Sequence, residues 1–251
     1  MVQEQYTRAG LPGLLQQDVS AKAGILVLRR TGILRMHHLS TSHCSVAQVE
    51  LRTGLVYLVS AYFQYSENIQ SHISHLERVL EALKGEPVII AVDTNTHSSL
   101  WPSGEEQLRG RGRAAEERRE ALEAFILAKG FIVYNSEGEA ETFCSPNGAS
   151  NIDATLSTRS VKIGDWRVHE DVSTSDHRLI TFAVLGTRLG GGAKCGRGAC
   201  EVSGPRCGLG GIQIGPLAAR GEHILSSDAL WGIRSKKTVK GRNQNLYPIS
   251  K

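Results

Sequence analysis

The chain has 251 residues, 40% of them hydrophobic and 22% charged, an ordinary composition for a globular domain with a substantial core. No apolar run is long enough to span a bilayer, and the first ten residues lack the basic and apolar segments of a secretory signal. The formal charge of +4 is a weak hint of nucleic-acid binding, because the basic excess comes wholly from the last quarter of the chain.

The first part of the chain shows strand patterns followed by one helix. Residues 2–6 suit the end of a strand, and a loop rich in Gly, Pro and Gln follows through Asp18. Residues 23–30, 45–51 and 55–63 show the β-branched residues and alternation of strands, and three strands in succession suggest an antiparallel meander. Apolar residues at helical spacing then predict a helix that Ser66 or Asn68 can cap and that Gly85 ends.

The segment 88–101, VIIAVDTNTHSSLW, joins a buried strand to a cluster of polar groups. Its run of Val, Ile and Ala is typical of a central strand, and it ends abruptly at Asp93, Asn95 and His97. An ordinary strand followed by an Asx-rich turn has the same pattern. This segment alone therefore leaves a turn and a catalytic site equally open.

The next part alternates loops, one helix and short strands. A polar loop is expected at 102–108 and a basic loop, RGRGR, at 109–113; the latter could contact DNA phosphates or lie in solvent. Residues 114–129 predict a second helix that Gly130 ends. Short strands are predicted at 131–134, 141–144, 151–156, 166–170 and 177–185. This order predicts an α/β or α+β layered domain, best matched by a two-sheet sandwich with helices outside.

Residues 187–251 differ in character from residues 1–186, which we expect to form the domain. They contain 13 glycines without periodicity, so we expect a disordered tail. The tail carries 11 Lys and Arg against 3 Asp and Glu, hence net +8, whereas residues 1–186 carry 18 against 22, hence net −4.

The cysteines fall into two groups. Cys44 and Cys144 lie far apart beside strand candidates and are predicted to be free thiols. Three cysteines and one histidine of the tail could be interpreted as zinc ligands. Their spacing contains no compact C-x-x-C motif, so we prefer the interpretation that these cysteines are unrelated free thiols. This group comprises Cys195, Cys200, Cys207 and His223.

Asp153 is a lone carboxylate in a largely apolar strand, where an unpaired charge is costly. The triplet Ser175-Asp176-His177, at the start of the last strand of the domain, supplies an imidazole. We therefore expect Asp153 to contact His177, to fix its ring and to favour its charged form.

Several motifs in order resemble the endonuclease/exonuclease/phosphatase superfamily, and within it the apurinic-endonuclease-like domain of insect non-LTR retrotransposons. Residues 142–156 match the pattern T-F-x-x-x-x-G-x-S-x-I-D-x-T-L of those elements throughout, and the resemblance covers residues 1 to about 185. The motifs are VQEQY with Glu4, SAYF with Tyr62, VDTNTHSSLW with Asp93 and Asn95, NIDATLS with Asp153, and TSDHRLITF with Asp176 and His177.

The resemblance implies a four-layered α/β sandwich with its active site at one rim, acting on double-stranded DNA. It assigns a divalent metal ion to Glu4 and Asp176, and hard oxygen ligands of this kind suit Mg²⁺ or Mn²⁺. The family pattern begins with a strand carrying an Asn that shares the metal, and this chain starts after that position. We therefore expect the sandwich to lack its first strand.

The resemblance also assigns roles in catalysis. Asp93 would orient or deprotonate the attacking water, and Asn95 would hold the phosphate. His177, held by Asp153, would sit against a phosphate oxygen, and Tyr62 would hydrogen-bond the same phosphate. An imidazolium, an amide and a phenol beside a metal ion can together stabilise the charge that builds on phosphate oxygens.

Three functions stay open. The first is a metal-dependent DNA endonuclease of the nucleus, which nicks one strand so that its 3′-hydroxyl primes reverse transcription. The second is a phosphatase or phosphodiesterase of the same superfamily, against which the match at residues 142–156 argues. The third is an inactive, truncated remnant that at most binds nucleic acid through its basic tail.

Overall fold

The computed structural model describes residues 1, 3, 13–27, 32–52, 54–109, 112–170, 172 and 175–187, and the backbone of residues 211–214. The predicted strand end at 2–6 therefore lies largely outside the described residues, as does the predicted metal ligand Glu4. Among the helices of this described part, none has both the length and the apolar character needed to cross a membrane.

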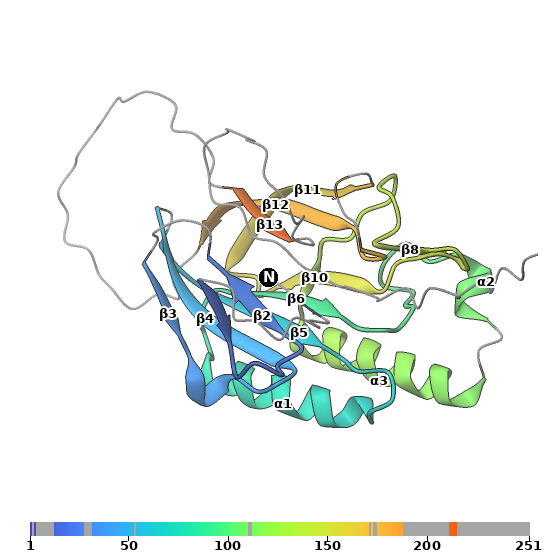
Figure 1. Cartoon of the computed structure of the whole chain (residues 1–251), viewed down its shortest axis with the longest axis horizontal. Coiled ribbons are helices and arrows are strands. Elements are labelled where there is room, and N and C mark those ends of the chain that lie inside the picture. Colours follow the sequence, from blue (N-terminus) through green and yellow to red (C-terminus); the bar gives the residue numbers. More distant parts are fainter. Residues whose placement is uncertain are drawn as a thin grey trace, which may run out of the picture.

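Two β-sheets face each other, with helices beneath the larger one (Figure 1). The larger sheet has the order β3-β4-β5-β6-β10-β7: β3 (Ile33–Arg35), β4 (Cys44–Leu51), β5 (Gly54–Tyr62), β6 (Val88–Asp93), β10 (Asp153–Ser157) and β7 (Ile132–Val133). The smaller sheet consists of β11 (Val161–His169), β12 (Leu179–Thr187) and β13 (Gly211–Ile214). Two further pairs are β1 (Leu14–Gln16) with β2 (Gly24–Leu26), and β8 (Phe143–Ser145) with β9 (Gly148–Ser150).

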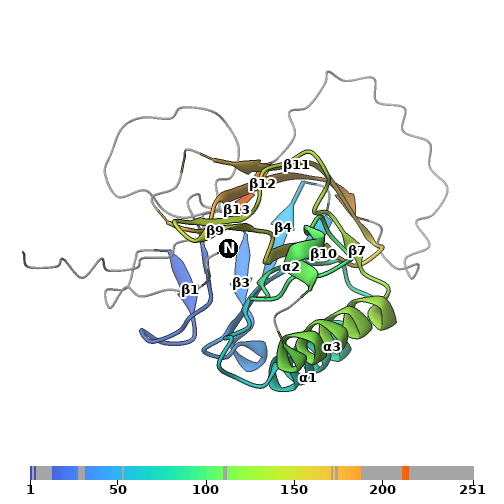
Figure 2. The same cartoon turned by 90° about the vertical axis from the view of Figure 1, so that its right-hand side faces the viewer.

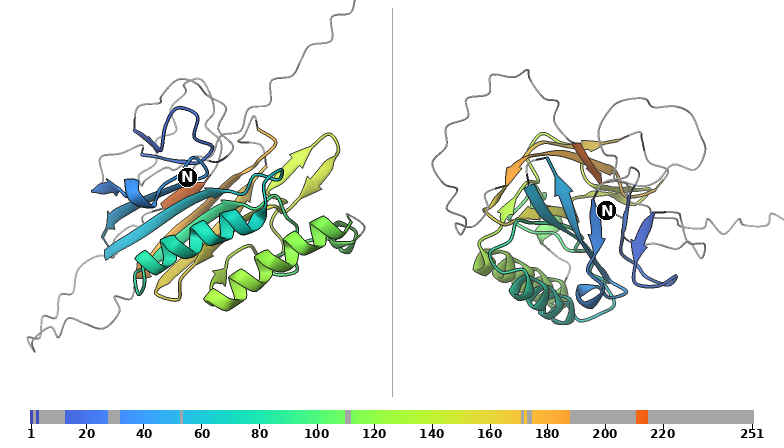
Figure 3. Two further views of the ribbon diagram at one scale, coloured as in Figure 1. Left: turned by 90° about the horizontal axis from the view of Figure 1, so that it is seen from below. Right: turned by 90° about the vertical axis from the view of Figure 1, so that its left-hand side faces the viewer.

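The helices α1 (Ile69–Ala82) and α3 (Arg113–Lys129) lie side by side on the outer face of the six-stranded sheet (Figures 2 and 3). The side chain of Asn68 caps α1 by accepting a hydrogen bond from the Gln70 backbone N–H at 2.9 Å. Gly130 ends α3 in the left-handed conformation, with φ of 64°. The sequence predicts both the Asn68 cap of α1 and the end of α3 at Gly130.

Strand alternation divides the apolar residues between two cores. In β6, Val88, Ile90 and Val92 face the helices, whereas Ile89 and Ala91 face the second sheet. Asp93 is the next residue on the second of these faces. The alternation therefore carries its carboxylate into the space between the two sheets.

The predicted α/β sandwich is confirmed, and the described residues supply three of its four expected layers: the helices, the six-stranded sheet and the three-stranded sheet (Figure 2). The predicted meander is wrong in one strand, because β2 pairs with β1 in a separate sheet and β3 takes the place beside β4. Residues 105–108, predicted as loop, form the short helix α2 (Glu105–Leu108), and 37–39 form the 3-10 helix η1 (His37–Leu39).

The segment predicted as a disordered tail contains one described strand. β13 pairs antiparallel with β12, from Ile180↔Ile214 to Ala183↔Gly211. Ile212 and Ile214 alternate with polar or small residues there, which is the local pattern of a strand. The rest of 188–251, including the tail cysteines, lies outside the described residues.

Candidate active site at the ends of three strands

Three predicted site residues lie in one row across neighbouring strands. β5 runs parallel to β6 with Tyr62 opposite Asp93, and β10 runs antiparallel to β6 with Asp153 opposite Asp93. Residues directly opposite each other in a sheet project from the same face. Tyr62, Asp93 and Asp153 therefore project together between the sheets, and all three are buried.

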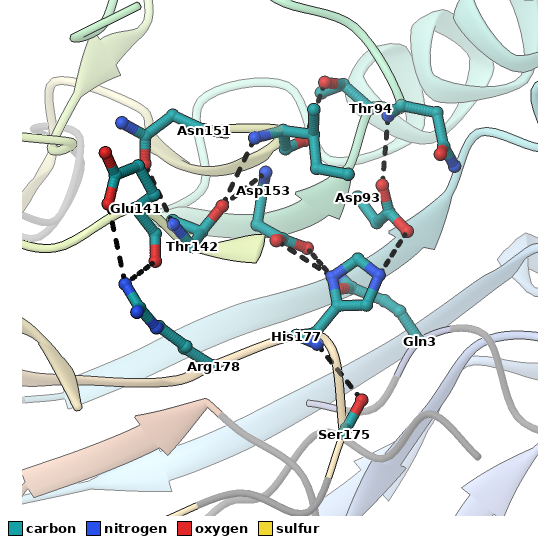
Figure 4. A network of polar contacts seen from close by, with 12 residues as sticks. Gln3, Asp93, Thr94, Glu141, Thr142, Asn151, Asp153, Ser175, His177 and Arg178 are labelled. Atoms are coloured by element: carbon teal, nitrogen blue, oxygen red, sulfur yellow. Dashed lines mark hydrogen bonds and ion pairs between the residues drawn. The ribbon is translucent and has the colours of Figure 1, made fainter. Parts of the chain in front are cut away.

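His177 enters this row from the second sheet, just before β12. Its Nδ1 lies 3.1 and 3.0 Å from the two carboxylate oxygens of Asp153, and its Nε2 lies 3.7 Å from Oδ2 of Asp93 (Figure 4). An ionised carboxylate can only accept hydrogen bonds, so the proton of this contact belongs to Nδ1. The predicted contact between Asp153 and His177 is confirmed, and it directs Nε2 toward Asp93.

Thr142 fixes the segments that carry Asp153 and His177 relative to each other, although the sequence motifs gave Thr142 no role. It is fully buried, and its hydroxyl oxygen accepts hydrogen bonds from the backbone N–H groups of Ile152 at 3.2 Å and Asp153 at 3.1 Å. Its carbonyl oxygen accepts from the Arg178 backbone N–H at 2.7 Å. One residue thus holds the start of β10 and the segment that carries His177 (Figure 4).

The ring of His177 is also placed by β8. Phe143 forms an isolated bridge with His177, and the two rings meet edge to face with centroids 5.0 Å apart. The Cys144 backbone N–H donates to the carbonyl oxygen of Asp176 at 2.7 Å. Backbone and ring contacts therefore both limit rotation of the imidazole.

Asn95 lies on the turn after β6, in the left-handed conformation with φ of 49°. Its backbone N–H donates to Oδ1 of Asp93 at 3.0 Å, and its side-chain Nδ2 donates to the carbonyl oxygen of Phe63 at 3.3 Å. This is an Asx-type turn, so the interpretation of this segment as a strand followed by an Asx-rich turn is correct. The same turn places Asn95 beside the row of Tyr62, Asp93 and Asp153, so a turn and a candidate site are compatible at this position.

Arg118 is a second buried residue that the sequence motifs do not reveal. It lies on α3 with 6% of its surface exposed, behind the turn that carries Asn95. Burial lowers the pKa of its guanidinium, while Tyr65, Asp93 and Tyr62 partly offset that effect. An arginine keeps its proton under such conditions, so a positive charge stands close to the row.

One group of side chains in the described part of the chain could bind a metal ion. It consists of Asp93, Asp153 and His177, whose ligand atoms all lie within 4.8 Å of one another. Carboxylate oxygens suit a hard divalent cation, so Asp93 and Asp153 supply donors of the kind that a metal site needs. The predicted ligand Asp176 is half-buried and lies outside this group. The other predicted ligand, Glu4, lies outside the described residues.

The remaining histidines of the motif region differ in exposure. His37 and His38, in η1, are exposed. His97, which belongs to the polar cluster after β6, is 8% exposed and lines a cavity of about 830 Å³ beside Asn95. Four arginines and two glutamates also line this cavity: Arg109, Arg113, Arg118, Arg119, Glu116 and Glu123.

The fold is similar to that of a solved endonuclease domain, and this likeness defines the class. The endonuclease domain of TRAS1, a telomere-specific non-LTR retrotransposon, has a TM-score of 0.58 and 25% identity, covering 68% of this chain and 76% of that chain. Together with the row of Tyr62, Asp93, Asp153 and His177, it defines an α/β sandwich of the endonuclease/exonuclease/phosphatase superfamily.

The sequence relatives narrow this class. The Pol polyprotein of the type-1 retrotransposable element R1 of Bradysia coprophila is 36% identical over 134 residues, covering 53% of this chain and 13% of that protein. The putative 115 kDa protein of element R1DM of Drosophila melanogaster is 27% identical over 194 residues, covering 73% and 19%. The sequence model of the endonuclease-reverse transcriptase family matches residues 56–181, and the chain belongs to this family.

Proposed function

We propose that this chain is a divalent-metal-dependent endonuclease that nicks one strand of double-stranded DNA, so that the new 3′-hydroxyl primes reverse transcription. The observation that supports it best is the position of His177 between Asp153 and Asp93, in a chain whose relatives are retrotransposon proteins. Such a reaction on chromosomal DNA would take place in the nucleus.

His177 would stabilise the charge that develops on the phosphate. Two carboxylates flank its ring and favour the imidazolium form. With Nδ1 held by Asp153, the Nε2–H would donate to a phosphate oxygen as negative charge builds there. Because Asp153, Thr142 and Phe143 hold the ring beforehand, little reorganisation would be needed during the reaction.

Asp93, Asn95 and Tyr62 would orient the reactants. Asp93 would position or deprotonate the attacking water. Asn95 uses one amide hydrogen on Phe63, so its second amide hydrogen would donate to the phosphate, and the Tyr62 hydroxyl would donate to the same group. A divalent cation, Mg²⁺ or Mn²⁺, held by Glu4 and Asp176 as the resemblance implies, would withdraw charge from the phosphate oxygens.

The cavity beside Asn95 supports a nucleic-acid substrate. Its lining carries more arginine than glutamate, and Arg109 and Arg113 are largely exposed there. Phosphate groups that flank the cleaved bond would meet these guanidinium groups. The opposing acidic partners, Glu105 and Glu117, form only exposed ion pairs, which DNA phosphates can displace at small cost.

A nicking assay on supercoiled plasmid with Mg²⁺ tests this proposal. We expect the unmodified chain to produce open circles, and His177→Ala or Asp153→Asn to lower the rate by about 10²-fold or more. Asp165→Asn is the matched control, because Asp165 is an exposed residue of β11 in the left-handed conformation that Asn also adopts. It should nick at the unmodified rate.

Other results would favour the alternatives. Hydrolysis of a phosphoinositide or a nucleotide in preference to DNA would point to a phosphatase of the same superfamily. If neither the unmodified chain nor His177→Ala nicked DNA, and both retained it in a salt-sensitive manner, the chain would be an inactive nucleic-acid-binding remnant.

A further inference from the structure

Arg118 connects the two chain segments that carry the site. Its side chain donates to four acceptors, and each lies after β5 or after β6. They are the carbonyl oxygens of Phe63 at 2.9 Å, Thr94 at 3.2 Å and Glu67 at 3.1 Å, and the hydroxyl oxygen of Thr96 at 3.0 Å. A guanidinium has five N–H donors in a rigid fork, which suits it to hold several backbone acceptors at once.

The acceptors of Arg118 are neighbours of the site residues in sequence. Phe63 follows Tyr62, and Thr94 lies between Asp93 and Asn95. The Phe63 carbonyl oxygen accepts from both Arg118 Nη2 and Asn95 Nδ2, at 2.9 and 3.3 Å. The guanidinium of Arg118 and the side-chain amide of Asn95 thus share one acceptor, so a shift of that carbonyl oxygen would also move the partner of the Asn95 amide.

Arg118 also holds the turn that carries Asn95. Asn95 has φ of 49°, a left-handed conformation that asparagine adopts more readily than most residues, and Arg118 donates to the Thr94 carbonyl oxygen just before it. The acceptors of Arg118 are all neutral oxygens, so the guanidinium is not neutralised by direct contact with a carboxylate of the described residues. Its charge is therefore available to offset the carboxylates of the row.

We propose that Arg118, which reaches the cavity beside Asn95 with only 6% of its surface exposed and directs its donors to oxygens of the chain, is a positioning residue that sets the orientation of Asn95 and Asp93 for the nuclease reaction. This inference rests on the proposed endonuclease function. Its consequence is a split in the kinetic constants. Loss of Arg118 lowers kcat, because the reacting groups are misplaced, and leaves KM nearly unchanged, because the DNA-binding surface stays in place.

The test uses Arg118→Met, which keeps the aliphatic stem and removes every donor, and Arg118→Lys, which keeps the charge and three donors. We expect Arg118→Met to lower kcat by about 10²-fold with KM within about threefold, and Arg118→Lys to recover part of the loss. Arg78→Met is the chemical control, since Arg78 is an exposed residue of α1 whose guanidinium contacts His75, outside the cavity beside Asn95, and it should keep the unmodified kcat.

A second readout does not depend on activity. The NMR signals of the Asn95 side-chain amide should shift in Arg118→Met, return part of the way in Arg118→Lys, and stay in place in Arg78→Met. Leu122→Ala is the stability control: it removes core packing on the same helix without touching these acceptors, so it should lower thermal stability and leave the Asn95 signals and kcat nearly unchanged.

The outcomes separate the two hypotheses. Unmoved Asn95 signals in folded Arg118→Met, an unchanged kcat, or a kcat loss that Leu122→Ala reproduces at equal stability would each overturn the positioning role. If the unmodified chain fails to nick DNA while the Asn95 signals shift as expected, the proposed function fails and the positioning of the turn by Arg118 stands.

Discussion

His72 is a buried histidine whose titration should control how stability depends on pH. Its ring stacks on Phe63 with centroids 5.1 Å apart, and burial lowers its pKa to about 4 from an ordinary 6.5, although Glu67 opposes the shift. Between pH 6.5 and 4 the unfolded chain therefore binds a proton that the folded chain does not. The free energy of unfolding should fall across this window by up to about 3 kcal/mol.

Urea unfolding between pH 7 and 4 measures this effect. His72→Gln removes the titrating group, so the free energy of unfolding should depend less steeply on pH, whatever its value at pH 7. His75 has a lowered pKa for the same reason, and adding His75→Gln should flatten the curve further. His38→Gln alters an exposed ring and serves as control. A slope equal to that of the unmodified chain in the double variant would contradict the prediction.

Only part of the site could be predicted at the level of single residues. Asp153 indicated a partner, because a lone carboxylate in an apolar strand must be paired, and His177 is that partner. Arg118 gave no such signal: it belongs to the run EERRE, which has the composition of a solvated helix face. Its acceptors are mostly backbone carbonyl oxygens, which every residue possesses and no sequence motif identifies.

At the scale of elements, the N-cap of α1 makes a local contribution that can be measured. The Asn68 side chain satisfies one of the backbone N–H groups left without a partner at the start of the helix, that of Gln70. Asn68→Ala should lower the free energy of unfolding by about 1 kcal/mol. Chemical denaturation with an unchanged m-value would measure it.

A neighbouring substitution controls for the loss of a polar side chain. Gln70→Ala alters an exposed residue of the same turn and keeps the backbone N–H that Asn68 binds, so it should change stability by less than about 0.5 kcal/mol. If both variants lost the same stability, the cap would not be the cause.

The sequence predicted best those helices and strands whose pattern lies within their own residues. Both long helices and the strands β4, β5 and β6 follow from periodicity and end signals within their own residues. β1, β3 and β9 have three residues each, too few to show a period. The pairing of β2 with β1, rather than within the meander, depends on contacts between separate segments, which the local pattern does not contain.

At the scale of the whole molecule, the site exists because two sheets meet along one face. Asp93 and Asp153 come from the six-stranded sheet, whereas His177 comes from the segment that leads into the three-stranded sheet. The sequence motifs identify the candidate site residues, and the packing of the two sheets sets the distances between their side chains. A change that slid one sheet on the other would separate the imidazole from both carboxylates without altering any site residue.

The charge of the whole chain predicts how the tail contributes to DNA binding. Residues 187–251 carry 11 Lys and Arg against 3 Asp and Glu, while residues 1–186 carry 18 against 22. Each cation that contacts a phosphate releases counterions and steepens the dependence of binding on salt by about 0.9 per contact. Deleting residues 188–251 should therefore weaken DNA retention and reduce the slope of log K against log salt by at least about 2.

Deletion also removes β13 from the edge of β12, so a second variant must separate charge from structure. Replacing the tail Lys and Arg by Gln keeps Gly211–Ile214, which contains no charged residue, and removes only the charge. If charge is the cause, filter binding at several salt concentrations should give this variant the same reduced slope as the deletion. If the neutral tail kept the original slope while the deletion lost it, the tail would act through strand pairing, and the electrostatic explanation would be wrong.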